Sequence, residues 1–295
     1  MLEFKKPTLS DMDWVTRAMR SSGEMACEYC FGNLYIWTEV YGNTIAGRDG
    51  MLFARDGGEN PIYLYPCGEG DMKTAIAELI ELEKVDNKPL EMYCLTPDRV
   101  RQLEALYPDE FEFKADRDYF DYIYLSEELA SLAGRKLHSK RNHISFFKKT
   151  FDWNYEKITK DNLSECYDMN MLWEKQRNPD GNEELNDELR AIDRAFEHFE
   201  RLGFVGGLLR KDGEVIAYTF GEPINGKVFC THVEKAFADV RGAYPMINQQ
   251  FCQNELMSYK YINREDDTGD EGLRQAKESY CPAILLPKFT AKHKV

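Results

Sequence analysis

The sequence predicts an α+β protein with mixed sheets, built from two tandem domains of similar plan. Short apolar strands alternate with amphipathic helices in both halves of the 295-residue chain. Two pairs of similar segments also recur at an offset of about half the chain, which indicates duplication. The length accommodates two domains more readily than one hydrophobic core. We therefore expect domains at 1–133 and 134–295, the second beginning with a connector helix over 134–151.

The first half begins with an expected strand near 3–6 and a helix capped by Ser10 or Asp11. The strands and helices expected after it, in chain order, are a strand pair over 44–55, a strand over 61–67, a helix over 71–85, a strand over 90–95, a helix over 97–106 and a strand over 120–125. An apolar run, NLYIW, ends at Trp37.

The second half repeats this plan. The expected elements are helices over 162–176 and 184–203, strands over 206–211, 215–224 and 227–235, a helix over 244–257, a strand over 259–263, a helix over 271–280 and a strand over 283–289. This order of elements is that of the acetyltransferase-like (GNAT) fold: a helix pair, antiparallel strands, then a helix, a strand, a helix and a strand. A hairpin is expected across Asn225 and Gly226.

Two segment pairs support the duplication. FKKPTLSDM, from Phe4, is similar to YEKITKDNL, from Tyr155, and both run from a strand into a polar cap and a helix. GMLFARDGG (50–58) parallels GGLLRKDGE (206–214), each a strand that leads into an Asp-Gly turn.

Composition limits the classes of protein. The formal net charge is −14, so repulsion from phosphates opposes extensive coating of nucleic acid, although one basic docking strip is compatible with it. No run approaches the ~20 apolar residues of a membrane helix, and we expect a cytoplasmic protein. Only Cys27 and Cys30 of the eight cysteines form a CxxC, for which packed, reduced thiols are the favoured interpretation. No metal or tightly bound cofactor is expected.

Three segments carry a family resemblance: RKLHSKRNHISFFKK (135–149), HVEKAFADVRGAYPMINQQF (232–251) and YINREDDTGDEGLRQAKESYCP (261–282). They closely resemble bacterial proteins grouped with the C-terminal domain of phosphatidylglycerol lysyltransferases, and FGNLYIW (31–37) fits the same group. The resemblance spans nearly the whole chain. It implies two tandem GNAT-like domains, aminoacyl-tRNA as co-substrate, and a small-molecule, peptide or lipid-headgroup acceptor with an amine or hydroxyl.

Candidate catalytic residues lie in the strand KVFCTHVEK. Acyl transfer to an amine needs a base for the proton and a donor for the developing oxyanion. Strict alternation would place His232 and Glu234 on one side and Lys235 on the other. We expect Glu234 to be the base, with His232 beside it, and Lys235 or a backbone N–H to be the donor. A solvated Glu-Lys pair at a strand end is the alternative interpretation.

Candidate substrate-binding residues follow the strand YKYIN. Thr268, with Glu271 three residues on, matches a capping box that opens a helix. The cap does not account for the carboxylates beside Arg264. We expect Glu265 or Asp266 to bind an aminoacyl ammonium and Arg264 to bind a phosphate or carboxylate. An exposed acidic turn is the alternative.

The loop before the helix over 244–257 bears on acyl-CoA. A CoA site would require a cation and small residues whose backbone N–H groups cradle pyrophosphate, whereas this loop has Asp239 and Tyr244 at the corresponding places. Acyl-CoA is therefore disfavoured, although Arg241 could still reach a phosphate. The remaining substrate-binding candidates are Tyr244, Arg241 and Lys277. Lys277 is expected near the edge of the buried stripe of the helix over 271–280.

A basic strip over 134–150 contains six Lys or Arg and no acid. As a helix it has one apolar face, formed by Leu137, Ile144, Phe147 and Phe151. The candidates for binding an anion or tRNA are Lys140, Arg141, His143 and Lys148. The strip could instead neutralise the protein's own carboxylates.

The sequence thus favours an acyltransferase, most specifically an aminoacyltransferase that draws on aminoacyl-tRNA. A CoA-dependent N-acyltransferase is one alternative, and a non-catalytic binder of a small anionic ligand is another. The first half has no counterpart of VEKAFADVRGAY or INREDDTG, so the functional site is expected in the second domain.

Overall fold

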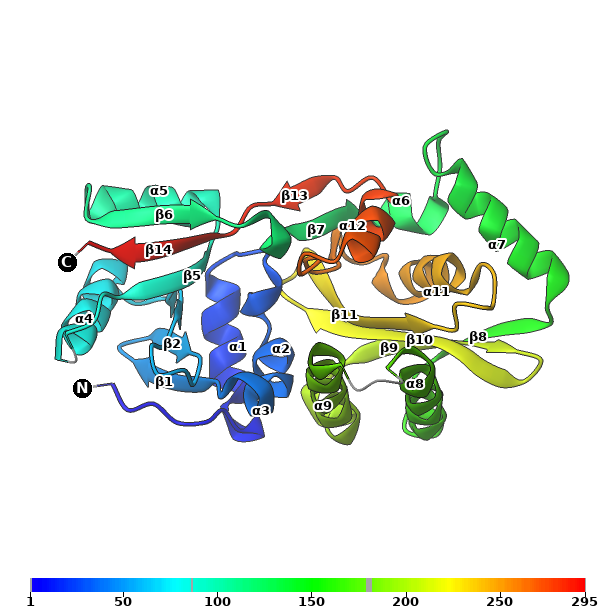
Figure 1. Cartoon of the computed structure of the whole chain (residues 1–295), viewed down its shortest axis with the longest axis horizontal. Helices are drawn as coiled ribbons and strands as arrows, with labels where there is room; N and C mark the ends of the chain where they lie inside the picture. The colour runs from blue at the N-terminus through cyan, green and yellow to red at the C-terminus, as the bar shows by residue number, and fades with distance from the viewer. Residues whose placement is uncertain (1, 86, 179–181, 295) are drawn as a thin grey trace. The chain divides into compact units, whose positions relative to one another are not determined.

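The computed structural model describes residues 2–85, 87–178 and 182–294 (Figure 1). The chain forms two compact units. Unit 1 comprises Met1–Asp121, Asp266–Glu271 and Leu285–Val295, and unit 2 comprises Tyr122–Glu265 and Gly272–Ile284. Among the described helices, none combines the length and apolar character that crossing a bilayer demands.

Unit 1 contains a mixed sheet in the order β1-β2-β3-β5-β14-β6, with β4 paired to β2. The strands are β1 (Thr44–Arg48), β2 (Met51–Arg55), β3 (Tyr63–Leu64), β4 (Cys67–Gly68), β5 (Glu91–Leu95), β6 (Phe111–Ala115) and β14 (Phe289–His293). Its α-helices are α1 (Met12–Ser21), α2 (Phe31–Ile36), α3 (Thr38–Tyr41), α4 (Met72–Val85) and α5 (Pro97–Leu106). Ile76 and Leu79 of α4 and Leu103 of α5 are fully buried in its core.

Unit 2 contains the second mixed sheet, in the order β13-β7-β12-β11-β10-β9-β8. The strands are β7 (Asp121–Leu125), β8 (Trp153–Lys157), β9 (Val205–Lys211), β10 (Glu214–Pro223), β11 (Val228–Ala236), β12 (Tyr261–Asn263) and β13 (Ile284–Leu286). Its α-helices are α6 (Ser126–Ser131), α7 (His138–Thr150), α8 (Leu163–Arg177), α9 (Glu183–Glu197), α10 (Phe199–Leu202), α11 (Ala243–Phe251) and α12 (Glu271–Glu278). Figure 1 shows α8 and α9 on one face of this sheet and α11 on the other. The predicted α+β class with mixed sheets is confirmed.

The two units differ from the expected ranges 1–133 and 134–295 because each sheet includes a strand from the other half of the chain. β7, from the first half, pairs with β12 in the second sheet, where Tyr122 and Tyr124 are buried. β14, from the C-terminal end, lies between β5 and β6 in the first sheet, where Ala291 is buried. The strand over 120–125 was expected and corresponds to β7, whereas the last expected strand, over 283–289, covers β13 and β14 was missed. In neither case do local sequence patterns predict which sheet the strand joins.

Tight turns account for two of the predicted hairpins. Asp49 and Gly50 join β1 to β2, Asp212 and Gly213 join β9 to β10, and all four residues have positive φ, as a two-residue hairpin turn requires. The Asp-Gly turn expected after β2 is instead a longer loop, since Asp56 N–H bonds to the Ile62 carbonyl.

At three further places the structure adds to or differs from the sequence analysis. The strand expected near 3–6 is a single bridge between Lys5 and Ile45. The apolar run that ends at Trp37, for which no element was specified, forms α2, which ends at Ile36. Strand β6 was missed, because its sequence, FEFKA, is short and half polar.

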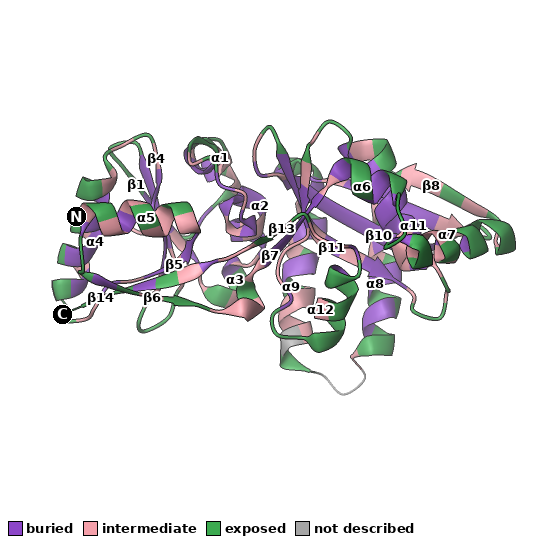
Figure 2. Ribbon diagram, turned by 90° about the horizontal axis from the view of Figure 1, so that it is seen from above, coloured by how far each residue is buried: buried purple, intermediate pink, exposed green. Residues whose placement is uncertain are grey.

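The predicted amphipathic connector is confirmed as α7. Leu137, Ile144 and Phe147 are buried, and the Phe151 ring lies 5.2 Å from that of Phe147. Most of the remaining surface of this helix is exposed (Figure 2). The apolar face attaches the basic strip to the core of unit 2.

Candidate functional site

A bulge in β11 determines which side chains of unit 2 share a face. Phe220 of β10 pairs with Val233 and Gly221 pairs with Thr231, so His232 has no partner on β10. A Cβ on Gly221 would overlap the Cys230 carbonyl, which explains why glycine stands opposite the bulge. The extra residue reverses the alternation of side chains. The prediction that His232 and Glu234 share one side is therefore wrong.

On the α11 face, Glu234 and Arg264 form a buried ion pair. Arg264 Nη2 donates to Glu234 Oε1 at 2.8 Å, and the two side chains are 11% and 10% exposed. Asn248 of α11 donates to the second oxygen of Glu234 at 3.0 Å. Arg264 therefore holds a carboxylate of the protein itself.

Two polar atoms of this cluster have no hydrogen-bond partner. They are Arg264 Nη1 and Asn248 Oδ1, and both are shielded from solvent. The Arg264 guanidinium lies 4.9 Å from the centre of the Tyr280 ring, and Lys140 Nζ of α7 lies 4.1 Å from the same ring. Burial, and then the charge of Arg264, lower the pKa of Lys140. This part of unit 2 thus contains two cations and one carboxylate, a balance that favours an anion.

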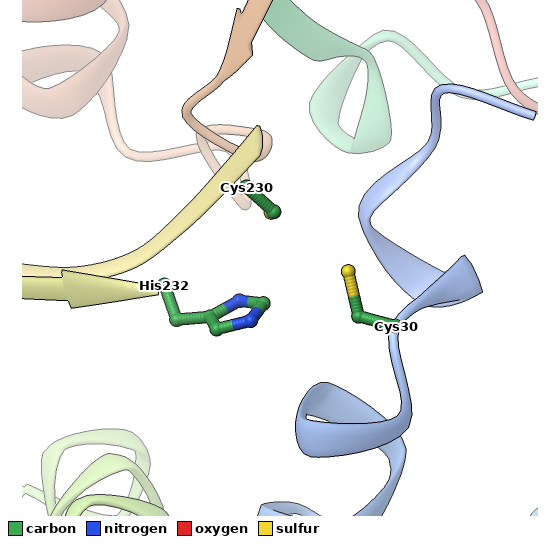
Figure 3. Close-up of side chains that lie close together, drawn as sticks. All are labelled: Cys30, Cys230 and His232. Atoms are coloured by element: carbon green, nitrogen blue, oxygen red, sulfur yellow. The ribbon is translucent and has the colours of Figure 1, made fainter. Parts of the chain in front are cut away.

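On the opposite face, His232 lies between two carboxylates. Its Nδ1 is 2.7 Å from Glu265 Oε1 and its Nε2 is 3.1 Å from Glu222 Oε1. Both carboxylates accept, so both ring nitrogens donate, and the ring is an imidazolium. Burial alone would lower the pKa of His232, but the Cys230 sulfur and the two carboxylates hold it well above its ordinary value. Figure 3 shows Cys230 and His232 extending from β11.

This geometry has consequences for two predicted roles. His232 has no free lone pair with which to accept a proton, so it cannot act as a base in this arrangement. Glu265 is already paired with a cation, and its side chain is 26% exposed.

Lys235 is also bound within unit 2. Its Nζ donates to Glu188 of α9 at 2.7 Å and lies 3.8 Å from the centre of the Trp173 ring of α8. The side chain is only 7% exposed. Lys235 thus connects β11 to the two helices and does not stand at an open strand end.

Strands β11 and β12 separate close to these side chains. β12 pairs with β11 only at Val228, Phe229 and Cys230. Among the described strands, residues 231–236 of β11 pair with β10 alone. Backbone N–H groups on the open edge of this stretch are suited to hold a developing oxyanion.

Asp266 belongs to a polar cluster of unit 1. Lys288 Nζ lies 2.7 Å from Glu28 Oε1, 2.8 Å from Asp121 Oδ1 and 3.4 Å from Asp266 Oδ2. Burial alone would lower the pKa of Lys288, but Asp121 and the other negative groups hold it well above its ordinary value. Asp266 is therefore separate from Glu265, its neighbour in the sequence.

The expected capping box is wrong. Thr268 has φ +47° and lies in a turn, and α12 begins at Glu271 itself. Asp267 stabilises this turn by accepting from Gly269 N–H, while its other oxygen binds Arg117 at 3.2 Å. Lys277 of α12, expected near the edge of the helix's buried stripe, is itself buried, with 8% of its surface exposed.

The loop before α11 packs against α7. Gly242 has φ +92°, and a Cβ there would lie 2.6 Å from the His143 carbonyl oxygen. Its need for glycine is thus explained by a neighbouring helix rather than by a pyrophosphate. Arg241 is exposed and lies 4.5 Å from the centre of the Phe146 ring, whereas Tyr244 is partly buried, which raises its pKa.

Along the basic strip, none of the six Lys and Arg forms an ion pair with a described residue. The structure therefore gives no support to the interpretation that the strip neutralises internal carboxylates. Arg141 donates to the carbonyls of Leu132 and Gly134, so it terminates α6. Lys148 is exposed and lies 5.4 Å from the centre of the Trp153 ring, and His143 is partly buried.

Sequence reasoning missed Asn248, Tyr280 and Glu222 as members of these clusters. Asn248 had a detectable signal, because it is an amide within the apolar helical run YPMINQQF. Glu222 had no detectable signal, because the bulge that positions its partner His232 cannot be seen in the sequence.

Comparison with known proteins places these clusters in a family context. The family model described as "Phosphatidylglycerol lysyltransferase, C-terminal" matches residues 20–292. The resemblance seen in the sequence is thereby confirmed.

Solved structures show the same fold. A conserved protein of unknown function from Bacteroides thetaiotaomicron VPI-5482 is 41% identical, with full coverage of both chains and a TM-score of 0.95. The C-terminal domain assigned to a lysylphosphatidylglycerol synthetase of Agrobacterium fabrum is 15% identical, with a TM-score of 0.68 and coverage of 98% of this chain and 93% of that one. The L-PGS of Bacillus licheniformis is 16% identical, with a TM-score of 0.59 and coverage of 92% and 94%. The predicted fold of two tandem GNAT-like domains is confirmed.

Proposed function

The chain belongs to the phosphatidylglycerol lysyltransferase C-terminal family, and from this premise we propose that it transfers an aminoacyl group from aminoacyl-tRNA to an amine or hydroxyl acceptor. The acceptor is a small molecule, a peptide or a lipid headgroup. A cytoplasmic location, where charged tRNA is made, is part of the proposal.

The observation that carries the proposal is the position of α7. Its cations have no internal counter-ions among the described residues. Lys140 of the same helix shares the Tyr280 ring with Arg264, so α7 borders the cluster that contains Glu234. A polyanion bound along α7 would therefore lie beside the Glu234 carboxylate and the open edge of β11. Phosphate contacts of this kind provide most of the affinity for nucleic acids.

The reaction assigns distinct tasks to this chain's groups. Backbone N–H groups of residues 231–236 receive the ester carbonyl oxygen as it becomes negative. Glu234, positioned by Arg264 and Asn248, accepts the proton from the attacking amine or hydroxyl. The new bond forms at the carbonyl carbon, the ester bond to the terminal ribose oxygen breaks, and that oxygen takes up the proton.

Two of the residues first considered catalytic become positioning residues in this proposal. His232 keeps Glu222 and Glu265 in place, and Lys235 fixes β11 against Trp173 and Glu188. Lys235 lies on the face opposite Glu234, so the oxyanion donors are backbone groups alone.

The test uses the full chain with a panel of radiolabelled aminoacyl-tRNAs and acyl-CoAs, each with amine, hydroxyl and lipid acceptors. The proposal predicts transfer of label from at least one aminoacyl-tRNA and from no acyl-CoA. Transfer from acyl-CoA alone would identify a CoA-dependent N-acyltransferase. If neither donor loses its label, a non-catalytic binder of a small anion is favoured.

A further inference from the structure

Glu174 of α8 is a buried carboxylate with no hydrogen-bond partner. The residue is 5% exposed, and neither of its oxygens has a bonding partner. It lies on the buried face of α8 with Cys166, Met169, Asn170 and Trp173, at helical spacing. A buried charge without a partner is costly, so this position calls for an explanation beyond packing.

Lys235, whose charge acts on Glu174, does not provide that partner. It is bonded to Glu188 of α9 at 2.7 Å and lies over the Trp173 ring. Burial raises the pKa of Glu174, while the charge of Lys235 opposes this and Glu188 and Asp193 raise the pKa further. Two of these three charged neighbours are therefore negative.

A cavity of about 670 Å³ lies beside this carboxylate, between α8 and α9. Its lining residues are Asp168, Met171, Leu172, Glu174, Lys175, Asn178, Asn186 and Leu189. Met171 and Leu172 are large apolar side chains left 41% and 56% exposed. The lining therefore combines an apolar wall with amide groups, two carboxylates and one cation, Lys175.

A second unpartnered group lies one helical turn from Glu174. Asn170 is fully buried, its Oδ1 accepts from the Tyr218 hydroxyl at 2.7 Å, and its Nδ2 has no partner. Residues four apart on a helix are neighbours. Glu174 and Asn170 thus offer acceptors and a donor on one buried face of α8.

We propose that the cavity between α8 and α9 binds a primary alkylammonium, with its nitrogen on the Glu174 carboxylate and its alkyl chain against Met171, Leu172 and Leu189. A carboxylate in an apolar surrounding is suited to an ammonium, which supplies both the missing charge and the missing hydrogen bonds.

The roles expected for Glu265 and Asp266 support this assignment. Both were candidates for holding an ammonium, but Glu265 is paired with His232 and Asp266 with Lys288. Glu174 is a carboxylate of unit 2 that is buried, lines a cavity and has no described partner. Since its oxygens are shielded from solvent, entry of the ligand requires a side chain at the rim to move.

The experiment measures binding rather than transfer. The full chain is titrated calorimetrically with n-pentylamine, with 1-pentanol and with pentanoate at pH 8. We expect saturable binding of n-pentylamine that is at least about tenfold tighter than that of 1-pentanol, and no binding of pentanoate. In Glu174→Gln the preference for the amine should disappear, whereas in the control Asp161→Asn, an exposed acid before α8, it should remain.

A readout besides affinity separates a binding role from a structural one. Glu174→Gln removes an uncompensated charge, so its urea midpoint should equal or exceed that of the wild type. Binding of n-pentylamine should tighten as pH rises from 5 to 8 in the wild type but not in Glu174→Gln. Equal binding of amine and alcohol, or an amine preference that survives in Glu174→Gln, would overturn the proposal. The two proposals can fail separately. If the chain transfers no label but binds n-pentylamine in this way, the proposed function is refuted and the proposed binding site stands.

Discussion

The polar clusters of the two units differ in how completely they are satisfied. In unit 1, Lys288 has Glu28, Asp121 and Asp266 within ion-pair distance, and it is 3% exposed. In unit 2, Arg264 pairs with Glu234 but keeps one nitrogen without a partner, and Glu174 has none. Buried polar groups are normally satisfied, so the unit 1 cluster is explained by structure alone, whereas the unpartnered atoms of unit 2 are what the two proposals rest on.

The largest expected effect tests the structural side of this comparison. Lys288→Met should lower the free energy of unfolding by about 3–5 kcal/mol, because it removes a buried cation that three carboxylates share. The measurement is urea unfolding at pH 7. The matched control is Lys292→Met, on the same strand, whose pair with Glu91 is exposed and should contribute at most about 1 kcal/mol. Equal effects of the two substitutions would remove the distinction drawn for unit 1.

A smaller loss of stability is expected when the ion pair between Arg264 and Glu234 of unit 2 is broken. Arg264→Met leaves one buried carboxylate, Glu234, which still accepts from Asn248. We expect a cost of about 3 kcal/mol by urea unfolding. Arg264→Lys should recover part of this stability, since it keeps the charge but not the planar fork. A variant as stable as the wild type would mean that the pair is not formed.

His232 provides a pH-dependent comparison. Its pKa is raised in the folded state, so its stabilisation is fully present below the unfolded value of about 6.5 and is lost as pH rises through the folded value. His232→Asn should therefore cost about 1–3 kcal/mol near pH 5.5. The deficit should shrink only at alkaline pH, when urea unfolding is followed from pH 5.5 to 10. A deficit that grows with pH would show that the ring is neutral when folded.

The smallest effect concerns the exposed part of α7. Lys136→Ala combined with Lys148→Ala should leave stability unchanged within about 1 kcal/mol, because both side chains are exposed. The log–log dependence of tRNA affinity on salt should flatten by about one unit for each phosphate that the variant no longer binds. An unchanged slope would argue against docking along the helix. Lys140 and Arg141 are less suitable for this test, since one contacts Tyr280 and the other holds the end of α6.

The fold was largely predictable because local signals mark most of its elements. Asp-Gly pairs located the hairpins at Asp49 and Asp212, and the helical spacing of apolar residues located α7. The exchange of β7 and β14 was not predictable, since strand partners are chosen by tertiary packing rather than by local sequence.

The site was less predictable because one residue alters its geometry. The regular alternation of side chains along a strand predicted that His232 and Glu234 share one face. The bulge places them on opposite faces. Glu174 was not detectable either, because apolar side chains of α8 such as Met171 and Leu172 are exposed, so the sequence of this helix does not show which face is buried. The prediction that unit 2 holds the functional site stays a prediction.

The most direct test of aminoacyl transfer compares Glu234→Gln with Glu200→Gln, an exposed control on α10. Single-turnover transfer from the labelled aminoacyl-tRNA to its acceptor is followed together with the tRNA dissociation constant. The account predicts that Glu234→Gln slows transfer by about 100-fold or more while tRNA affinity stays within about twofold, and that Glu200→Gln changes neither. Transfer at the wild-type rate in Glu234→Gln would contradict the account.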